Sequence, residues 1–177
     1  MTPDAAVLMA AYNRWMNRRM YEAAAQLPEA ALRQDRGAFF GSIQATFNHI
    51  AVGDTVWLHR FAQPEAASML REALQPFPLP TSLRQELADS FAGLQRYRAA
   101  LDAVIVRWAG ALTNAQLEGE LVYRNTTGKT FRRSWQQLVL HFFNHQTHHR
   151  GQASTLLFQA GVDVGVTDLI ALPTEEL

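Results

Sequence analysis

Apolar residues recur at steps of three and four along most of the chain, which is the repeat of helices that bury one face. The first such stretch covers residues 3–26. A loop follows at residues 35–37, and a second stripe then runs to Phe61 with Ser42 in place to act as its N-cap. The pattern therefore predicts two long helices in the first third of the chain.

Two serines are each followed three residues later by a glutamine, which is the form of a capping box at the start of a helix. Ser82 precedes an apolar stripe over residues 83–112, and Ser134 precedes another over residues 135–159. We predict the third and fourth helices there, each beginning at its serine. Gly161 supplies a stop after the last one.

The segments that join these helices carry turn-forming and strand-forming residues. Residues 62–80 include four prolines, which predicts a long crossover loop with one short turn around residues 66–73. Residues 117–132 hold β-favouring side chains on both sides of 125–128, which is typical of a small hairpin. We expect an all-α four-helix bundle, a single domain over residues 1–177 with an irregular tail.

Composition narrows the possible partners and the compartment. Sixteen basic residues balance sixteen acidic ones, so the chain offers no net field for nucleic acid. It has no cysteine, which excludes disulfides and thiolate metal ligands and favours a reducing cytoplasm. No apolar run approaches the roughly 20 residues that would span a membrane. We expect a cytoplasmic protein that binds a small-molecule substrate.

Five of the six histidines fall in two places, one in the middle of the second helix and four close together in the fourth. The apolar stripe of the fourth helix is interrupted by His145, His149 and Gln152. Polar groups on a buried stripe need partners. Side chains four residues apart lie on one helix face, so two imidazoles at this spacing converge on a single ion.

A third ligand must come from another helix, and the candidates are His49 and His59. We choose His49, which lies in the middle of its helix beside small residues such as Thr46 and Gly53. Small neighbours let a second helix or a bound molecule approach. His49, His145 and His149 are thus the candidate ligands of one divalent metal ion.

Other interpretations of these residues stay open. An HxxxH pair also occurs by chance in helices, and single histidines are often satisfied core residues. His141 and His148 flank the stripe as surface or supporting residues, and His141 would replace His149 if the helix were rotated. Asp54 is an acid on the apolar stripe of the second helix, and we expect an arginine of the first helix to pair with it.

The chain resembles the DinB family of bacterial proteins, also called DinB/YfiT-like. The resemblance follows nearly the whole chain in order, through YNRWMN at 12–17, FNHI at 47–50, an Asp54–Trp57–Leu58 pattern and NHQTHHRGQ at 144–152. It implies an up-up-down-down four-helix bundle with a long crossover between the second and third helices, often as a homodimer. It also implies a metal triad, which corresponds here to His49, His145 and His149.

Two classes of function follow from the triad and the resemblance. Members of the family hold zinc, nickel or other divalent ions, and some use a low-molecular-weight thiol to conjugate or isomerise a small electrophile. Three imidazoles leave one coordination position open, as in catalytic sites, with Gln152 as an orienting group. The alternative is a non-catalytic protein in which the ion stabilises the bundle.

In either class, each ligand histidine is expected to donate its other ring N–H to a carbonyl, carboxylate or amide. The tail offers Asp163 and Asp168 as candidate acceptors.

Overall fold

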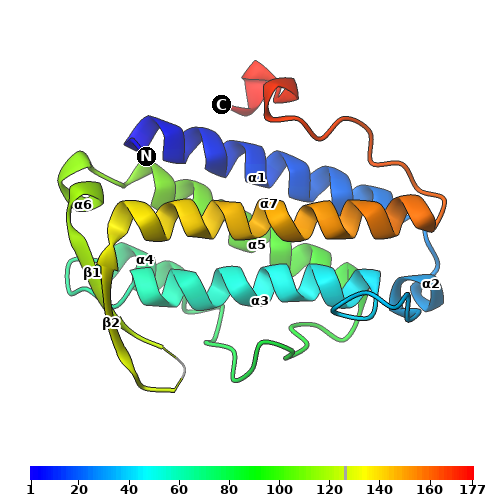
Figure 1. Ribbon diagram of the computed structural model, residues 1–177, viewed down its shortest axis with the longest axis horizontal. Coiled ribbons are helices and arrows are strands. Elements are labelled where there is room, and N and C mark those ends of the chain that lie inside the picture. Colours follow the sequence, from blue (N-terminus) through cyan, green and yellow to red (C-terminus); the bar gives the residue numbers. More distant parts are fainter. Residues whose placement is uncertain (126) are drawn as a thin grey trace.

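The computed structural model describes residues 1–125 and 127–177 and consists mainly of four long helices (Figure 1). Helices α3 and α5 run in the same direction, and α1 and α7 run in the opposite one. Both α1 and α3 pack against α5 and α7. The predicted all-α four-helix bundle is confirmed, but in chain order its helices run up-down-down-up and not up-up-down-down as the resemblance implies. The four helices are α1 (Pro3–Ala24), α3 (Ile43–Phe61), α5 (Phe91–Gly110) and α7 (Trp135–Gln159).

Two of the long helices, α3 and α7, begin at the serine N-caps that the sequence predicts. The Ser42 hydroxyl accepts a hydrogen bond from the backbone N–H of Ala45 at 3.1 Å, at the start of α3. Ser134 accepts one from the N–H of Gln137 at 3.5 Å, at the start of α7. These bonds satisfy N–H groups that a helix leaves without a partner in its first turn.

The third helix begins later than predicted. It starts at Phe91, with the Ser90 hydroxyl accepting from the N–H of Gly93 at 3.1 Å, so the predicted start at Ser82 is wrong. Gln85 Oε1 instead accepts from the backbone N–H of Thr81 at 2.7 Å, which closes a local turn.

Asn48 of α3 explains why residues 85–87 do not continue as helix. Its side-chain amide donates to the carbonyl of Gln85 at 2.7 Å and accepts from the N–H of Leu87 at 2.9 Å. The carbonyl of Gln85 and the N–H of Leu87 are thereby bound to α3 and are not free to form the hydrogen bonds of a helix. The segment before α5 is held against α3, at the place where the candidate ligand His49 lies.

Short elements complete the connections. The crossover contains α4 (Ser68–Ala73), and the predicted hairpin is formed by β1 (Glu120–Arg124) and β2 (Thr130–Ser134). The two strands pair antiparallel with Glu120 opposite Ser134, and Thr126 of the predicted turn lies outside the described residues. The sequence did not predict α2 (Glu29–Arg33) or α6 (Asn114–Glu118).

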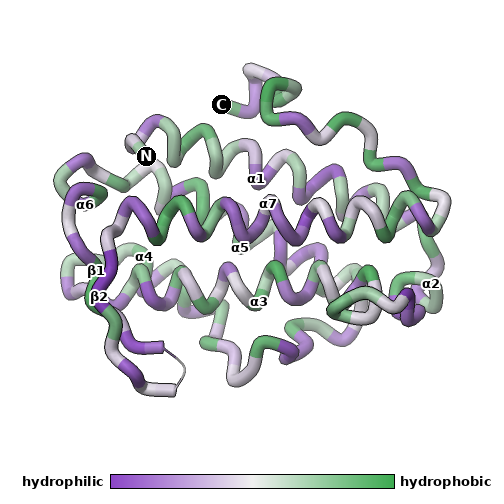
Figure 2. Tube along the Cα trace, viewed as in Figure 1, coloured by the Kyte–Doolittle hydropathy of each residue, from purple (hydrophilic) through white to green (hydrophobic). Residues whose placement is uncertain are grey.

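The C-terminal tail runs along α1 and contains the 3-10 turns η1 (Leu169–Ala171) and η2 (Thr174–Glu176). Arg14 and Arg18 of α1 form ion pairs with Glu176 of η2. Hydrophobic and hydrophilic residues alternate along each long helix (Figure 2). Of the helices that the structure describes, none is long and apolar enough to cross a membrane.

The apolar core forms two clusters, one toward each end of the bundle. Near the hairpin, Phe61 stacks on Trp108 with ring centroids 4.7 Å apart. In the other cluster, Tyr21 stacks on Phe91 at 5.3 Å. Asp54 of α3 lies between the two along the helix, so a polar layer divides the core.

Asp54 pairs with α5 and not with the first helix, which corrects the prediction. Its Oδ2 accepts from Arg98 at 2.6 Å, and Arg98 also lies 2.8 Å from Asp102. Asn17 of α1 donates to Asp102 at 3.0 Å. The arginines of α1 turn toward the tail, and one of them, Arg19, donates to the carbonyl of Val164. Hence α1 contributes a neutral amide to this cluster.

Helix α7 supplies further polar residues to the same layer. Gln146 and Arg150 are buried, and Arg150 donates to Asn13 of α1. His145 and His149 are only half-buried. The buried face of α7 therefore includes Gln146 and Arg150, and the two histidines lie at its edge toward α3, not on the central stripe as predicted.

Candidate metal centre

Three histidines from two helices meet beside the polar layer. His49 of α3 and His145 and His149 of α7 each offer one ring nitrogen, and these atoms all lie within 4.8 Å of one another. The ring centroids of His145 and His149 are 4.4 Å apart, and those of His49 and His149 are 4.6 Å apart. The group could hold a divalent metal ion.

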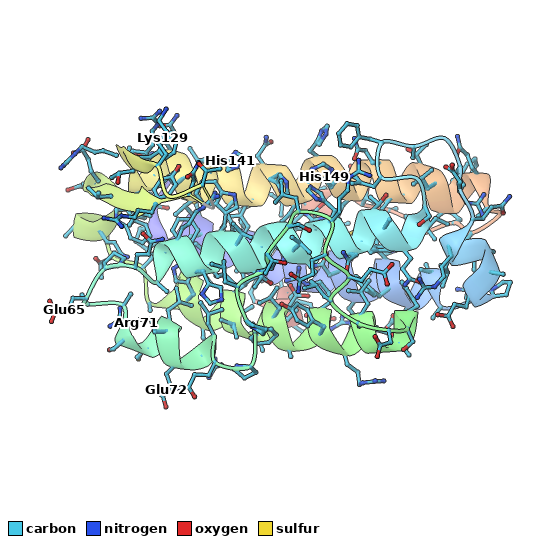
Figure 3. All side chains as sticks on the ribbon, turned by 90° about the horizontal axis from the view of Figure 1, so that it is seen from below. Glu65, Arg71, Glu72, Lys129, His141 and His149 are labelled. Carbon is cyan, nitrogen blue, oxygen red and sulfur yellow. The ribbon has the colours of Figure 1, made fainter. Side chains whose placement is uncertain are left out.

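The remaining histidines stay outside this group. His59 Nε2 is bound to the carbonyl of Phe77 at 2.7 Å, on the crossover side of α3. His141 is exposed and packs on Trp57, with ring centroids 5.0 Å apart. Figure 3 shows His141 toward the hairpin end of the bundle and His149 well away from it. The choice of His49 over His59 agrees with this placement.

A glycine lets α7 approach α3 closely at the triad. A Cβ built on Gly53 would lie 2.8 Å from His145 Cε1, which is closer than real Cβ atoms approach, and 3.4 Å from its Nδ1. Glycine inside a helix costs about 1 kcal/mol relative to alanine. Gly53 therefore destabilises α3 slightly, but it leaves the space in which the imidazole of His145 packs against the α3 backbone.

We expect the Gly53→Ala variant to lose most of its metal affinity while it keeps its helical fold. The added methyl group displaces the His145 ring, and ligand geometry fails with shifts well below 1 Å. Metal titration followed by circular dichroism measures both effects. Gly110→Ala is the matched control, because nothing lies within 4 Å of a Cβ at that position. Equal metal affinity in the two variants would contradict this role of Gly53.

Hydrogen bonds orient two of the three rings. His149 Nδ1 lies 2.8 Å from Gln152 Oε1, so an amide is in place to accept the N–H that a ligand histidine is expected to donate. His49 Nδ1 lies 3.4 Å from the carbonyl of Leu83. An N–H at each Nδ1 leaves the Nε2 lone pair free for a metal ion. The tail does not take part through Asp163, whose Oδ1 accepts from the N–H of Gly165.

His145 differs from the other two. Its Nδ1 is buried and has no hydrogen-bond partner among the described residues, so the expected N–H donation is absent here. A buried nitrogen without a partner is costly, and a bound ion or water would satisfy it. This unsatisfied atom is an independent sign that the group fits a metal ion.

Electrostatics keep the three rings neutral. Burial, followed by the neighbouring His149 and His49, lowers the pKa of His145 to about 3. Burial also lowers the pKa of His49 and of His149 below the ordinary value. The neutral imidazole is the form that binds a metal. The donor set thus fits a divalent ion at neutral pH.

Phe40 covers the triad from the loop that precedes α3. Its ring stacks on His49 with centroids 3.9 Å apart and an interplanar angle of 21°, and its edge meets His149 at 5.4 Å. The loop turns at Gly37 and Gly41, which have φ values of 67° and 83°. Other residues rarely adopt these values. Sequence analysis missed Phe40, because a loop residue belongs to no periodic pattern.

Comparison with known proteins defines the family of this chain. The sequence profile of the DinB family matches residues 1–176. The chain belongs to the DinB family. Protein DinB of Bacillus subtilis (strain 168) is 27% identical to it over 168 residues, which cover 93% of this chain and 91% of that relative.

The DinB match and the local geometry lead to the same region of the molecule. The matched range includes both helices that carry the histidine group, α3 and α7. Among the described residues of this DinB chain, the three histidines are the group of side chains that could hold a metal ion.

Proposed function

We propose that His49, His145 and His149 bind one divalent metal ion, zinc or nickel, and that this DinB protein is a metal-dependent enzyme. The reaction we propose is the transfer or isomerisation of a small electrophile with a low-molecular-weight thiol as nucleophile. The observation that carries the proposal is the convergence of three neutral imidazoles with no fourth protein ligand among the described residues. This is the donor set of catalytic sites rather than of closed structural ones.

A divalent ion held in this way lowers the pKa of a thiol or water at its remaining coordination position. The chain's own residues prepare the site for it. Gln152 and the carbonyl of Leu83 fix two rings, and Phe40 shields them from solvent. The histidines need no proton transfer to act as ligands, because they are already neutral.

Within the described chain, the carboxylates near the triad offer no free general base for metal-assisted hydrolysis, which favours a thiol. Two cavities border Phe40, one lined by His49 and one by Gln152. Among the residues that the structure describes, Glu86 is the one carboxylate that lines them, and it lies 3.7 Å from Arg33. Hydrolysis usually needs a general base beside the nucleophile, whereas an activated thiolate does not.

A non-catalytic role is the second candidate. The triad joins α3 to α7, so an ion there would cross-link two helices and stabilise the bundle. In that case removal of the metal would lower the melting temperature, and no substrate would turn over. We favour the enzyme, because structural metal sites usually have four protein ligands, whereas a site with three leaves a position open for a substrate.

A cobalt-substituted protein separates these two roles. If the site is catalytic, a small thiol binds the ion and changes the visible spectrum, and conversion of an aryl halide or epoxide requires both metal and thiol. His145→Ala should abolish this conversion, while circular dichroism remains that of the native fold. The structural role would be favoured if no physiological thiol changes the cobalt spectrum and no substrate shows metal-dependent turnover.

A further inference from the structure

A small cavity of about 280 Å³ adjoins the candidate metal centre on the side of His49. It lies between the N-terminal turn of α3 and the segment 83–88 that Asn48 holds in place. His49 itself lines the cavity, so a molecule inside it lies beside one ring of the triad. The volume is close to the lower end of the range for ligand sites, which favours a small occupant.

The charges around this cavity are predominantly positive. Arg33 lines it and is balanced by Glu86, 3.7 Å away. Arg84 also lines it and makes no ion pair or side-chain hydrogen bond in the part of the chain that the structure describes. The N-terminus of α3, capped by Ser42, adds its positive helix-dipole end. Arg84 is therefore an exposed and unbalanced cation at the edge of the space beside His49.

Gln44 supplies a second and independent sign of a ligand. Its side chain lines the cavity and is buried, with only 6% of the residue exposed. Its Oε1 has no hydrogen-bond partner within the described parts of the chain. A buried polar atom left unpaired costs about 1–3 kcal/mol, so such atoms in native proteins usually have a partner. Rotation of the amide by 180° would exchange its oxygen and nitrogen, so that the NH₂ group, a hydrogen-bond donor, would occupy this position.

We propose that this cavity binds the carboxylate of a small molecule whose other end reaches the metal ion. Arg84 is the cation that recognises the carboxylate, and the Gln44 amide, turned so that its NH₂ group meets the ligand, donates a hydrogen bond to it. The inference rests on the proposed function, in which that other end is a thiol. It adds a ligand class: the thiol carries a carboxylate within a few bonds of the sulfur.

Matched thiols test the recognition by Arg84. Cobalt-loaded protein is titrated with 3-mercaptopropionate and with 3-mercapto-1-propanol, which differ in the carboxylate. We expect the acid to bind about tenfold more tightly, the size of effect that 1.4 kcal/mol produces. Arg84→Gln should remove that preference without changing the affinity for the alcohol. Arg107→Gln, an exposed arginine that lines a different cavity, should preserve it.

The outcomes separate this inference from the proposed function. If both thiols change the cobalt spectrum with equal affinity, the carboxylate site is wrong and the thiol chemistry stands. If neither thiol changes the spectrum, the proposed thiol chemistry is wrong. The carboxylate site is then tested by NMR titration of metal-free, ¹⁵N-labelled protein with 3-mercaptopropionate. A shift of the Gln44 side-chain amide that disappears in Arg84→Gln supports the carboxylate site, and no shift overturns it.

Discussion

Replacement of His145 by alanine is expected to remove stoichiometric metal from the protein. Each imidazole supplies one of three protein ligands, and even the loss of a supporting hydrogen bond weakens metal affinity by about 10–100-fold. We therefore expect a loss of at least about 100-fold for a ligand itself. His149→Ala should behave in the same way. Metal analysis of protein purified without a metal-affinity tag measures the effect.

His59→Ala is the control for both variants. His59 belongs to α3, as His49 does, but its ring is bound to the carbonyl of Phe77 and takes no part in the triad. This variant should keep its full complement of metal. Undiminished metal in both His145→Ala and His149→Ala would end the proposal.

The largest effect on stability is expected from Arg98→Met. Arg98 is buried between Asp54 and Asp102, and its removal leaves two buried carboxylates without their cation. Although burial alone would lower the pKa of Arg98, the two carboxylates raise it above its ordinary value, so the residue is charged in the folded protein. Removal of one partner of a buried ion pair typically costs about 3–5 kcal/mol.

Urea unfolding measures this loss of stability. Arg107→Met on the same helix is the control, because Arg107 is exposed, and it should change the free energy of unfolding by no more than about 0.5 kcal/mol. A loss of less than about 1 kcal/mol in Arg98→Met would show that the buried carboxylates do not depend on this cation.

Local sequence patterns were sufficient for most of the fold. The helical repeat located the four long helices, and the caps at Ser42 and Ser134 are present. The start of the third helix at Ser82 was wrong for a tertiary reason. Asn48 binds the backbone of residues 85–87 and leaves the capping to Ser90, which no window of local sequence reveals.

The three candidate ligands were predictable from the sequence, but the residues packed around them were not. The spacing of His145 and His149 placed both on one face, and that face meets His49. The central stripe was assigned wrongly, because Gln146 and Arg150 look like surface residues in the sequence. Their burial depends on partners in other helices, such as Asn13 of α1.

The same limit explains the correction at Asp54. The sequence shows that a buried acid needs a cation, but each helix of the bundle carries arginines. Only the packing decides that Arg98 faces Asp54 while Arg14 and Arg18 face the tail. Loop residues such as Phe40 follow no repeat, so their contact with His49 becomes visible only in three dimensions.

Anomalous diffraction from crystals of the untagged protein tests the central claim most directly. The account predicts one peak per chain at the metal absorption edge, about 2.0–2.1 Å from one nitrogen each of His49, His145 and His149. The Gly53→Ala protein should lack this peak or show it at reduced height. A protein that holds stoichiometric metal with its anomalous peak elsewhere, or crystals grown with excess zinc that show no peak between the three rings, would contradict the account.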